Sequence, residues 1–199
     1  MGELAVVNFV SLDGVMQSVL SPEEDRDGGF DRGGWVLPYV DAAVERFMSD
    51  STAGAAALLL GRRTYEIFAA TWPYADRSDP AVAAMNAMPK YVASRTLTDP
   101  SWENSTVLGA DLPAAVTEIK KRTEGEIVLL GSGGLLRTLV EHDLVDEYRL
   151  LLFPLILGDG KRLFDTGTAP RDLTLTASEA SSTGVLINTY RRTAGAGRA

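Results

Sequence analysis

Three short segments combine glycine, hydroxyl side chains and arginine in a way that suits the binding of phosphate groups. They are Gly61-Arg62-Arg63-Thr64, Ser94-Arg95 and Gly131-Ser132-Gly133-Gly134-Leu135, and each follows an apolar run. Backbone N–H groups at a strand-to-helix turn bind phosphate oxygens, and arginine adds bidentate hydrogen bonds. Each segment alone is also compatible with a tight turn or a solvated loop. Together they favour one site for a polyphosphate ligand.

A carboxylate lies where such a ligand would react. Asp13 stands in Ser11-Leu12-Asp13-Gly14, directly after an apolar, β-branched run. Ligands of open α/β sheets collect at the carboxyl ends of strands, so Asp13 is a candidate for substrate binding or proton transfer. Aspartate is equally common in turns, and a purely structural role stays open.

The composition excludes several other kinds of chemistry. The chain of 199 residues has no cysteine and a single histidine, His142, which stands where a helical pattern ends. This excludes thiolate nucleophiles, disulfides, iron–sulfur clusters and histidine-based triads, and we expect no metal site. His142 is expected to interact with the last carbonyl groups of its helix.

The net charge of −8 argues against nucleic acid as a partner, because phosphate backbones are bound by clustered Lys and Arg. No apolar run is long enough to span a membrane, and the first residues do not read as a signal peptide. We therefore expect a cytoplasmic protein with a small-molecule partner.

Apolar patterning predicts the elements that position these residues. Short apolar runs predict strands over 4–10, 55–60, 90–94, 106–108, 127–130, 147–154, 173–177 and 185–191. Helical spacing predicts helices from Leu37, from Gly61 to about Trp72, over 80–88, after Asp111 and over 135–140. Strands that alternate with helices and then follow one another indicate an α/β fold. We expect a mostly parallel central sheet, flanked by helices, with an antiparallel C-terminal end.

The chain length fits one domain over residues 1–192, followed by a flexible tail over 193–199. Residues 17–35 are rich in glycine and charge and predict a long loop, which could be a binding lid or simply disordered. The run 150–157 is unusually apolar for an edge strand. It indicates either a homodimer interface or a place at the centre of the sheet.

Several of these segments resemble the dihydrofolate-reductase-like family that includes the C-terminal reductase domain of the bifunctional riboflavin-biosynthesis deaminase/reductase. The resemblance spans residues 4–165 and rests on SLDG, GRRTYE, VASRTL, LLGSGGLLRTLVE and DEYRLLLFPLILGDGKRLF. It implies a dihydrofolate-reductase-like fold and NADPH as the cofactor. GRRT and SRT would then hold the 2′-phosphate and nearby phosphates, and GSGG with Leu135 would hold the pyrophosphate.

The resemblance also implies residues that face a substrate. Asp13 resembles the substrate-facing aspartate of riboflavin reductases, and Asp41 resembles, one residue out of register, the acidic residue of dihydrofolate reductase. Phe30, Trp35 and Tyr39 could offer aromatic faces to a flat heterocycle, or could pack in the core. The deaminase half is absent, and the first strand lacks the basic residue that many riboflavin reductases carry there.

The expected function is therefore NADPH-dependent transfer of a hydride to a planar heterocyclic, carbonyl or imine compound, pterin-like or aminopyrimidine-like. In such a reaction the cofactor supplies the hydride and the protein orients it. The alternative is an NADPH-binding regulatory module without turnover.

Overall fold

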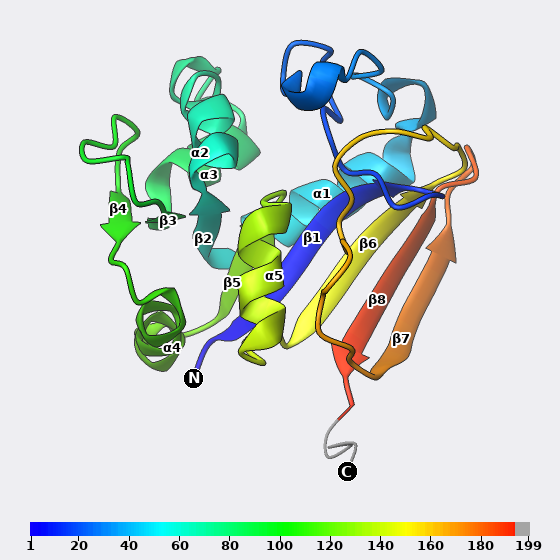
Figure 1. The fold of residues 1–199 in the computed structure, drawn as a ribbon. Coiled ribbons are helices and arrows are strands. Elements are labelled where there is room, and N and C mark those ends of the chain that lie inside the picture. Colours follow the sequence, from blue (N-terminus) through cyan, green and yellow to red (C-terminus); the bar gives the residue numbers. More distant parts are fainter. Residues whose placement is uncertain (194–199) are drawn as a thin grey trace.

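A sheet of eight strands runs through the molecule, with helices on both faces, in a computed structural model that describes residues 1–193 (Figure 1). The strands are β1 (Glu3–Ser11), β2 (Ala55–Gly61), β3 (Lys90–Ala93), β4 (Ser105–Leu108), β5 (Glu126–Leu130), β6 (Glu147–Phe153), β7 (Leu173–Ala180) and β8 (Leu186–Arg192). The helices are α1 (Ala42–Ala53), α2 (Arg62–Ala69), α3 (Pro80–Ala87), α4 (Leu112–Arg122) and α5 (Gly133–Glu141), with 3₁₀ turns η1 (Asp27–Gly29), η2 (Leu37–Tyr39) and η3 (Trp72–Tyr74). Apart from Thr193, the tail expected over 193–199 lies outside the described residues.

The strand order is β4-β3-β2-β5-β1-β6-β8-β7. All neighbouring pairs from β4 to β6 are parallel, whereas β8 pairs antiparallel with both β6 and β7. This confirms the mostly parallel sheet with an antiparallel C-terminal end. Because β3, β2, β5 and β1 are adjacent and parallel, the segments that follow them emerge at one edge of the sheet.

Each face of the sheet has its own hydrophobic core. Helices α1, α2 and α3 cover one face through Val44, Tyr65 and Met85. Helices α4 and α5 cover the opposite face, with Ile119 and Leu139 among the buried side chains (Figure 1). The central strands carry apolar residues toward both faces, as a parallel sheet covered on two sides requires.

The helix predicted from Leu37 begins later than expected. Residues Leu37–Tyr39 form the 3₁₀ turn η2, and α1 starts at Ala42. Asp41 determines this boundary, because its extended backbone places Oδ1 3.1 Å from the N–H groups of Ala43 and Val44. An aspartate that accepts these bonds is a favourable helix N-cap.

The apolar run 150–157 is not one strand. β6 ends at Phe153, because Pro154 has no N–H with which to continue the ladder. β6 lies inside the sheet, between β1 and β8, and Leu151 and Phe153 are fully buried. A place in the interior of the sheet therefore accounts for much of the apolar character of this run.

The loop over residues 17–35 is folded onto the core. Trp35 Nε1 donates to the carbonyl of Gln17 at 2.8 Å, and the N–H of Gly34 donates to the carbonyl of Ser18 at 2.8 Å, so the two ends of the loop are joined. At Gly33, a Cβ would lie 2.5 Å from the Cα of Pro22, so only glycine fits this close approach. Within residues 1–193, no helix has the length and apolar character needed to cross a membrane.

Candidate active site

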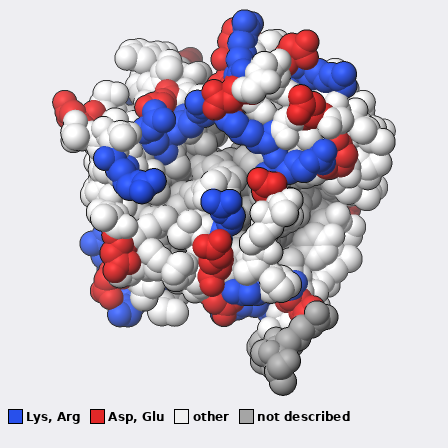
Figure 2. Space-filling view, viewed as in Figure 1, with Lys and Arg blue, Asp and Glu red and all other residues white. Residues whose placement is uncertain are grey.

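A cleft with a volume of about 2040 Å³ opens at the carboxyl ends of the parallel strands. The three predicted phosphate-binding segments all line it: Gly61, Arg62, Arg63 and Thr64 after β2, Ser94 and Arg95 after β3, and Gly131, Ser132, Gly133, Gly134 and Leu135 after β5. The space-filling view shows Lys and Arg side chains around a hollow on this face (Figure 2). The predicted convergence of the three segments on one cleft is thus present in the structure.

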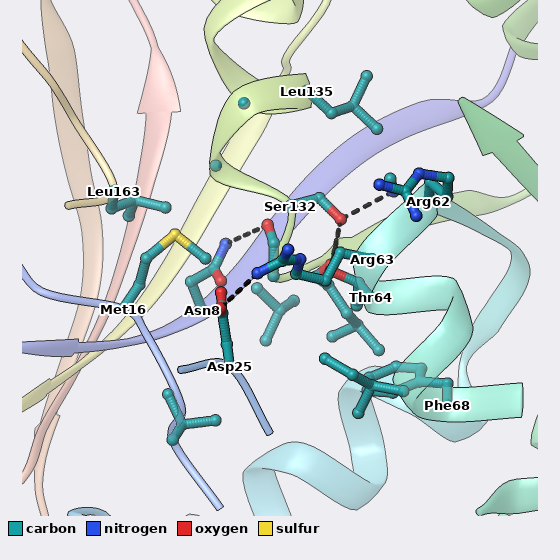
Figure 3. Close-up of a pocket in the computed structure, with 18 of the residues that line it drawn as sticks. Asn8, Met16, Asp25, Arg62, Arg63, Thr64, Phe68, Ser132, Leu135 and Leu163 are labelled. Carbon is teal, nitrogen blue, oxygen red and sulfur yellow. Dashed lines mark hydrogen bonds and ion pairs between the residues drawn. The ribbon is translucent and has the colours of Figure 1, made fainter. Parts of the chain in front are cut away.

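The segments after β2 and β5 are joined directly through Ser132 (Figure 3). Ser132 Oγ accepts a hydrogen bond from the N–H of Gly61 at 2.8 Å and lies 3.0 Å from Thr64 Oγ1. Gly131 and Ser132 both adopt left-handed backbone conformations, with φ of 58° and 62°. At Gly131 a Cβ would also lie 3.1 Å from Thr64 Oγ1, so glycine lets the two turns approach.

The helices that begin at this junction have uncapped N-termini. Asp41, Asp79 and Asp111 cap α1, α3 and α4 with their side chains. By contrast, Gly61 and Ser132 make no side-chain cap for α2 and α5. The first N–H groups of a helix have no partner within the helix, and they carry partial positive charge. The cleft is therefore bordered by two helix ends that can bind an anion.

The arginines of the cleft differ in how they are paired. Arg62 forms an exposed ion pair with Glu66, one turn further along α2, at 2.8 Å. Arg95 and Arg137 have no ion-pair partner among residues 1–193. A cation without a carboxylate partner keeps its hydrogen-bonding capacity for a ligand. Arg95 and Arg137 are thus available for an anionic group at the cleft.

Arg63 is held by the loop over residues 17–35. It pairs with Asp25 (Figure 3) and, at 2.5 Å, with Asp27. Both carboxylates also contact Lys161, at 2.7 and 2.8 Å. We call these four residues the charge cluster. Its carboxylates, above all Asp27, which accepts a hydrogen bond from Arg63, raise the pKa of the Arg63 guanidinium despite partial burial. The charge cluster attaches the loop to α2 beside the cleft. Its two carboxylates already balance the positive charge of Arg63.

Asp13 does not line the cleft but holds two turns together. Burial disfavours its charged form, but hydrogen bonds from Ser11 Oγ at 2.7 Å and from the N–H groups of Leu157 and Gly158 outweigh burial and lower its pKa to about 2. Its carboxylate is therefore ionised at neutral pH. Asp13 lacks the proton that a general acid needs.

Asp41 is likewise used by the fold. Besides capping α1, its Oδ2 accepts bonds from Ser182 Oγ at 2.6 Å and from the Ser182 N–H at 2.8 Å. The bond from Ser182 Oγ and those from the N–H groups lower the pKa of Asp41 to about 2. Asp41 thus links α1 to the turn between β7 and β8, and the expectation that it protonates a substrate finds no support in this geometry.

The aromatic side chains expected to face a substrate lie in the core instead. Phe30 and Trp35 are buried, and Tyr39 packs against the same cluster. Trp35 and Tyr39 make edge-to-face contacts with Phe153 of β6, with ring centroids 5.4 and 6.0 Å apart. None of the three lines the cleft. Core packing, the alternative that the sequence left open, is the role that the structure gives them.

The half of the cleft that adjoins α1, α2 and α3 is mainly apolar. Its aliphatic, aromatic and thioether side chains are Val19, Val40, Val44, Met48, Ile67, Phe68 and Met85. The acidic residues on its loop and α1 side are Glu23, Glu24, Asp25 and Glu45. This half can take a flat apolar group, and its charges disfavour an anionic one.

Among the polar residues of the cleft that sequence reasoning missed are Asn8 and Arg137. Asn8 is the one polar residue in the run Ala5–Val10 of β1, and that interruption was the available signal. Arg137 lies on α5, where a surface arginine gives no such signal. His142 caps α5 as expected, with Nδ1 donating to the carbonyl of Thr138 at 3.0 Å. Across residues 1–193, no group of three or more His, Asp or Glu side chains could hold a metal ion.

The fold and the cleft define an α/β domain with a ligand site at the carboxyl ends of its parallel strands. The chain belongs to the family of the RibD C-terminal domain, whose model matches residues 3–187. It is 26% identical, over 185 residues, to the uncharacterized protein YyaP of Bacillus subtilis strain 168, covering 91% of this chain and 90% of that protein.

Two solved structures share the fold. A protein from Shewanella sp. PV-4, provisionally assigned to riboflavin biosynthesis, matches with a TM-score of 0.70 and 22% identity, over 96% of this chain and 99% of that one. A pyrimidine reductase-like protein from Corynebacterium diphtheriae matches with a TM-score of 0.63 and 14% identity, over 98% and 93% of the two chains. Membership of the family supports a reductase-type function, and the two solved structures support the fold.

Proposed function

We propose that this protein is an NADPH-dependent reductase that transfers a hydride to a planar heterocyclic, carbonyl or imine compound, pterin-like or aminopyrimidine-like. The observation that carries the proposal is the junction of α2 and α5. Two uncapped helix N-termini, joined through Ser132 and Gly61, border one cleft together with arginines. This arrangement suits a ligand with several phosphate groups.

The residues of the cleft fit the parts of NADPH. The N–H groups at the start of α5, from Gly133 to Leu135, would bind the pyrophosphate. Arg62 and Arg95, on neighbouring strand ends, would bind the 2′-phosphate. Arg63 would add to this site only when it leaves Asp25 and Asp27. Arg95 follows β3, Arg62 follows β2 and the start of α5 follows β5, and these three strands are neighbours in the sheet.

NADPH, when bound, supplies a hydride from its nicotinamide ring, and such a step needs no cysteine, metal or histidine from the protein. The chain contributes orientation and exclusion of water. Val44, Met48 and Phe68 would hold a flat substrate by apolar contact beside the cofactor half of the cleft. Asp13 and Asp41 keep the surrounding turns and α1 in place and remain ionised.

A second candidate function is an NADPH-binding regulatory module without turnover. It is favoured by one observation: both aspartates considered as proton donors have a pKa of about 2 and are committed to the fold. If the protein is a reductase instead, the proton that accompanies the transferred hydride comes from water.

The two functions differ in whether NADPH is consumed. We expect NADPH to be oxidised in the presence of at least one compound from a panel of dihydropterins, aminopyrimidines, quinones, imines and aldehydes. The absorbance of NADPH measures this oxidation. The same samples should show a higher Tm with NADPH, because a ligand that binds only the native state stabilises it. A raised Tm without oxidation across the whole panel would favour the regulatory module over the reductase.

A further inference from the structure

Asn8 is a buried amide at the floor of the cleft with unused hydrogen-bonding capacity. The residue is 5% exposed and lines the cleft. In the register of β1, Val7 pairs with Leu130, the last residue of β5, so Asn8 stands where β5 has just ended. Asn8 therefore lies directly under the turn that opens α5.

The side chain makes a single hydrogen bond. Nδ2 donates to the carbonyl of Gly131 at 3.3 Å, as Figure 3 shows. A primary amide has two N–H donors and an oxygen that accepts two bonds. No protein group within residues 1–193 bonds to Oδ1 or to the second N–H. One donor and one acceptor of Asn8 thus remain for another molecule.

Neighbouring buried polar side chains are fully used by the fold. Gln17 Nε2 donates to the carbonyls of Asp25 and Asp27 at 3.0 Å, and its Oε1 accepts from the N–H of Lys161. Ser11 Oγ donates to Asp13 and accepts from the N–H of Val15. Buried polar groups in proteins are nearly always paired. Asn8 instead lines the cleft with its Oδ1 and one N–H unpaired, so a ligand bound there can use both.

The topology indicates which part of the ligand this is. Across the order β3-β2-β5-β1, the cleft presents Arg95, then Arg62, then the α5 N-terminus, and finally Asn8. A dinucleotide with its 2′-phosphate at the arginines and its pyrophosphate at α5 places its other base at β1. In NADPH that base carries a primary amide, which pairs in a complementary way with the amide of Asn8.

We infer that Asn8 binds the carboxamide of the nicotinamide ring, its Oδ1 accepting from the carboxamide NH₂ and its free N–H donating to the carboxamide oxygen. The inference rests on the proposed function. It makes Asn8 a specificity residue, since the pairing fixes which edge of the ring enters the cleft. A hydroxyl or an aliphatic side chain at this position could not make both bonds.

The test compares NADP⁺ with its 3-acetylpyridine analogue, in which a methyl group replaces the carboxamide NH₂. By isothermal titration calorimetry we expect the wild-type protein to bind NADP⁺ about 3- to 10-fold more tightly than the analogue. This difference in affinity corresponds to the loss of one hydrogen bond. In Asn8→Leu, which is similar in size, the two ligands should bind within about twofold of each other, because the group that distinguishes them is gone. Asn188→Leu is the matched control. Asn188 is a buried asparagine of β8, outside the cleft, and accepts a bond from Ser178.

The results separate the inference from the function on which it rests. Equal affinity of the wild-type protein for both ligands would overturn the role of Asn8, whether or not Asn8→Leu folds. Retention of the full preference in a folded Asn8→Leu protein would overturn it as well. If the wild-type protein binds neither ligand, the proposed cofactor itself is wrong.

Discussion

At the scale of single residues, the two aspartates illustrate how position decides chemistry. Both lie in segments that suggest reactivity, yet each carboxylate accepts several hydrogen bonds from the fold. Hydrogen bonds to the charged form lower a pKa, and a lowered pKa removes the proton that general acid catalysis requires. The partners of Asp13, Leu157 and Gly158, are 144 and 145 residues away in sequence, so sequence alone could not reveal them.

The low pKa of Asp13 predicts a pH-dependent contribution to stability. A carboxyl group with a folded-state pKa below its ordinary value of 3.8 stabilises the native state above that pH, and the contribution is lost as the pH falls toward about 2. We expect Asp13→Asn to lower the free energy of unfolding at pH 7 by about 1–2 kcal/mol, and the difference from wild type to shrink between pH 4 and pH 2. Urea denaturation at a series of pH values measures this. A constant difference across that range would contradict the assignment.

At the scale of elements, the arrangement of the cleft follows from short local signals. Glycine and serine at the β5–α5 turn, and glycine before α2, mark strand-to-helix junctions that parallel strands bring to one edge. These junctions were predicted together from sequence. The sequence could not decide between the two roles left open for the aromatic residues, because the packing of Trp35 and Tyr39 depends on Phe153 of a strand more than a hundred residues later.

The charge cluster shows the same limit of sequence reasoning. The segment around Arg63 predicts a phosphate-binding arginine, but in the structure Asp25 and Asp27 of the long loop form ion pairs with it. A phosphate group can use Arg63 only by displacing them. The loop therefore competes with the proposed cofactor for one of its cations.

Removing one carboxylate from the charge cluster should strengthen binding of NADPH. We expect Asp25→Asn to lower the Kd for NADPH by about two- to fivefold, the range for one partly exposed ion pair, with a smaller gain at high salt. Asp31→Asn is the control, since it removes the same charge from the same loop. Asp31 has no ion-pair partner within residues 1–193. Unchanged or weaker binding by Asp25→Asn, measured by calorimetry, would show that Arg63 does not contribute to the site.

At the scale of the whole molecule, one face of the C-terminal strands is left without a covering helix. Leu173 and Leu175 of β7 and Leu186 of β8 are 36%, 52% and 41% exposed. Leu175 pairs with Tyr190 and Leu186 pairs with Leu152, so these side chains share the face that also carries Leu150. Asn188 and Ser178 lie on the same face, between Leu186 and Leu175. Exposed apolar side chains gathered on one face in this way are typical of an interface.

We propose that this face joins two copies of the chain. The sequence suggested a homodimer through residues 150–157, of which Ile156 is 69% exposed, and the structure adds exposed apolar residues on β7 and β8. Multi-angle light scattering should give twice the chain mass of 21.3 kDa, and Leu175→Glu combined with Leu186→Glu should return the monomer. Glu179→Gln, on the opposite face of β7, serves as a control that should leave the mass unchanged. A monomeric wild-type protein at micromolar concentration would refute the dimer.

The central claim is that the cleft is built for the phosphates of NADPH, and its most direct test is calorimetric titration of the wild-type protein with NADPH and with NADH. Arg62 and Arg95 lose a dianionic partner when the 2′-phosphate is absent, and charge-assisted hydrogen bonds are worth about 1.5–3 kcal/mol each. The account predicts that NADPH binds at least about tenfold more tightly than NADH. Equal affinities, or no binding of NADPH at high micromolar concentration, would contradict it.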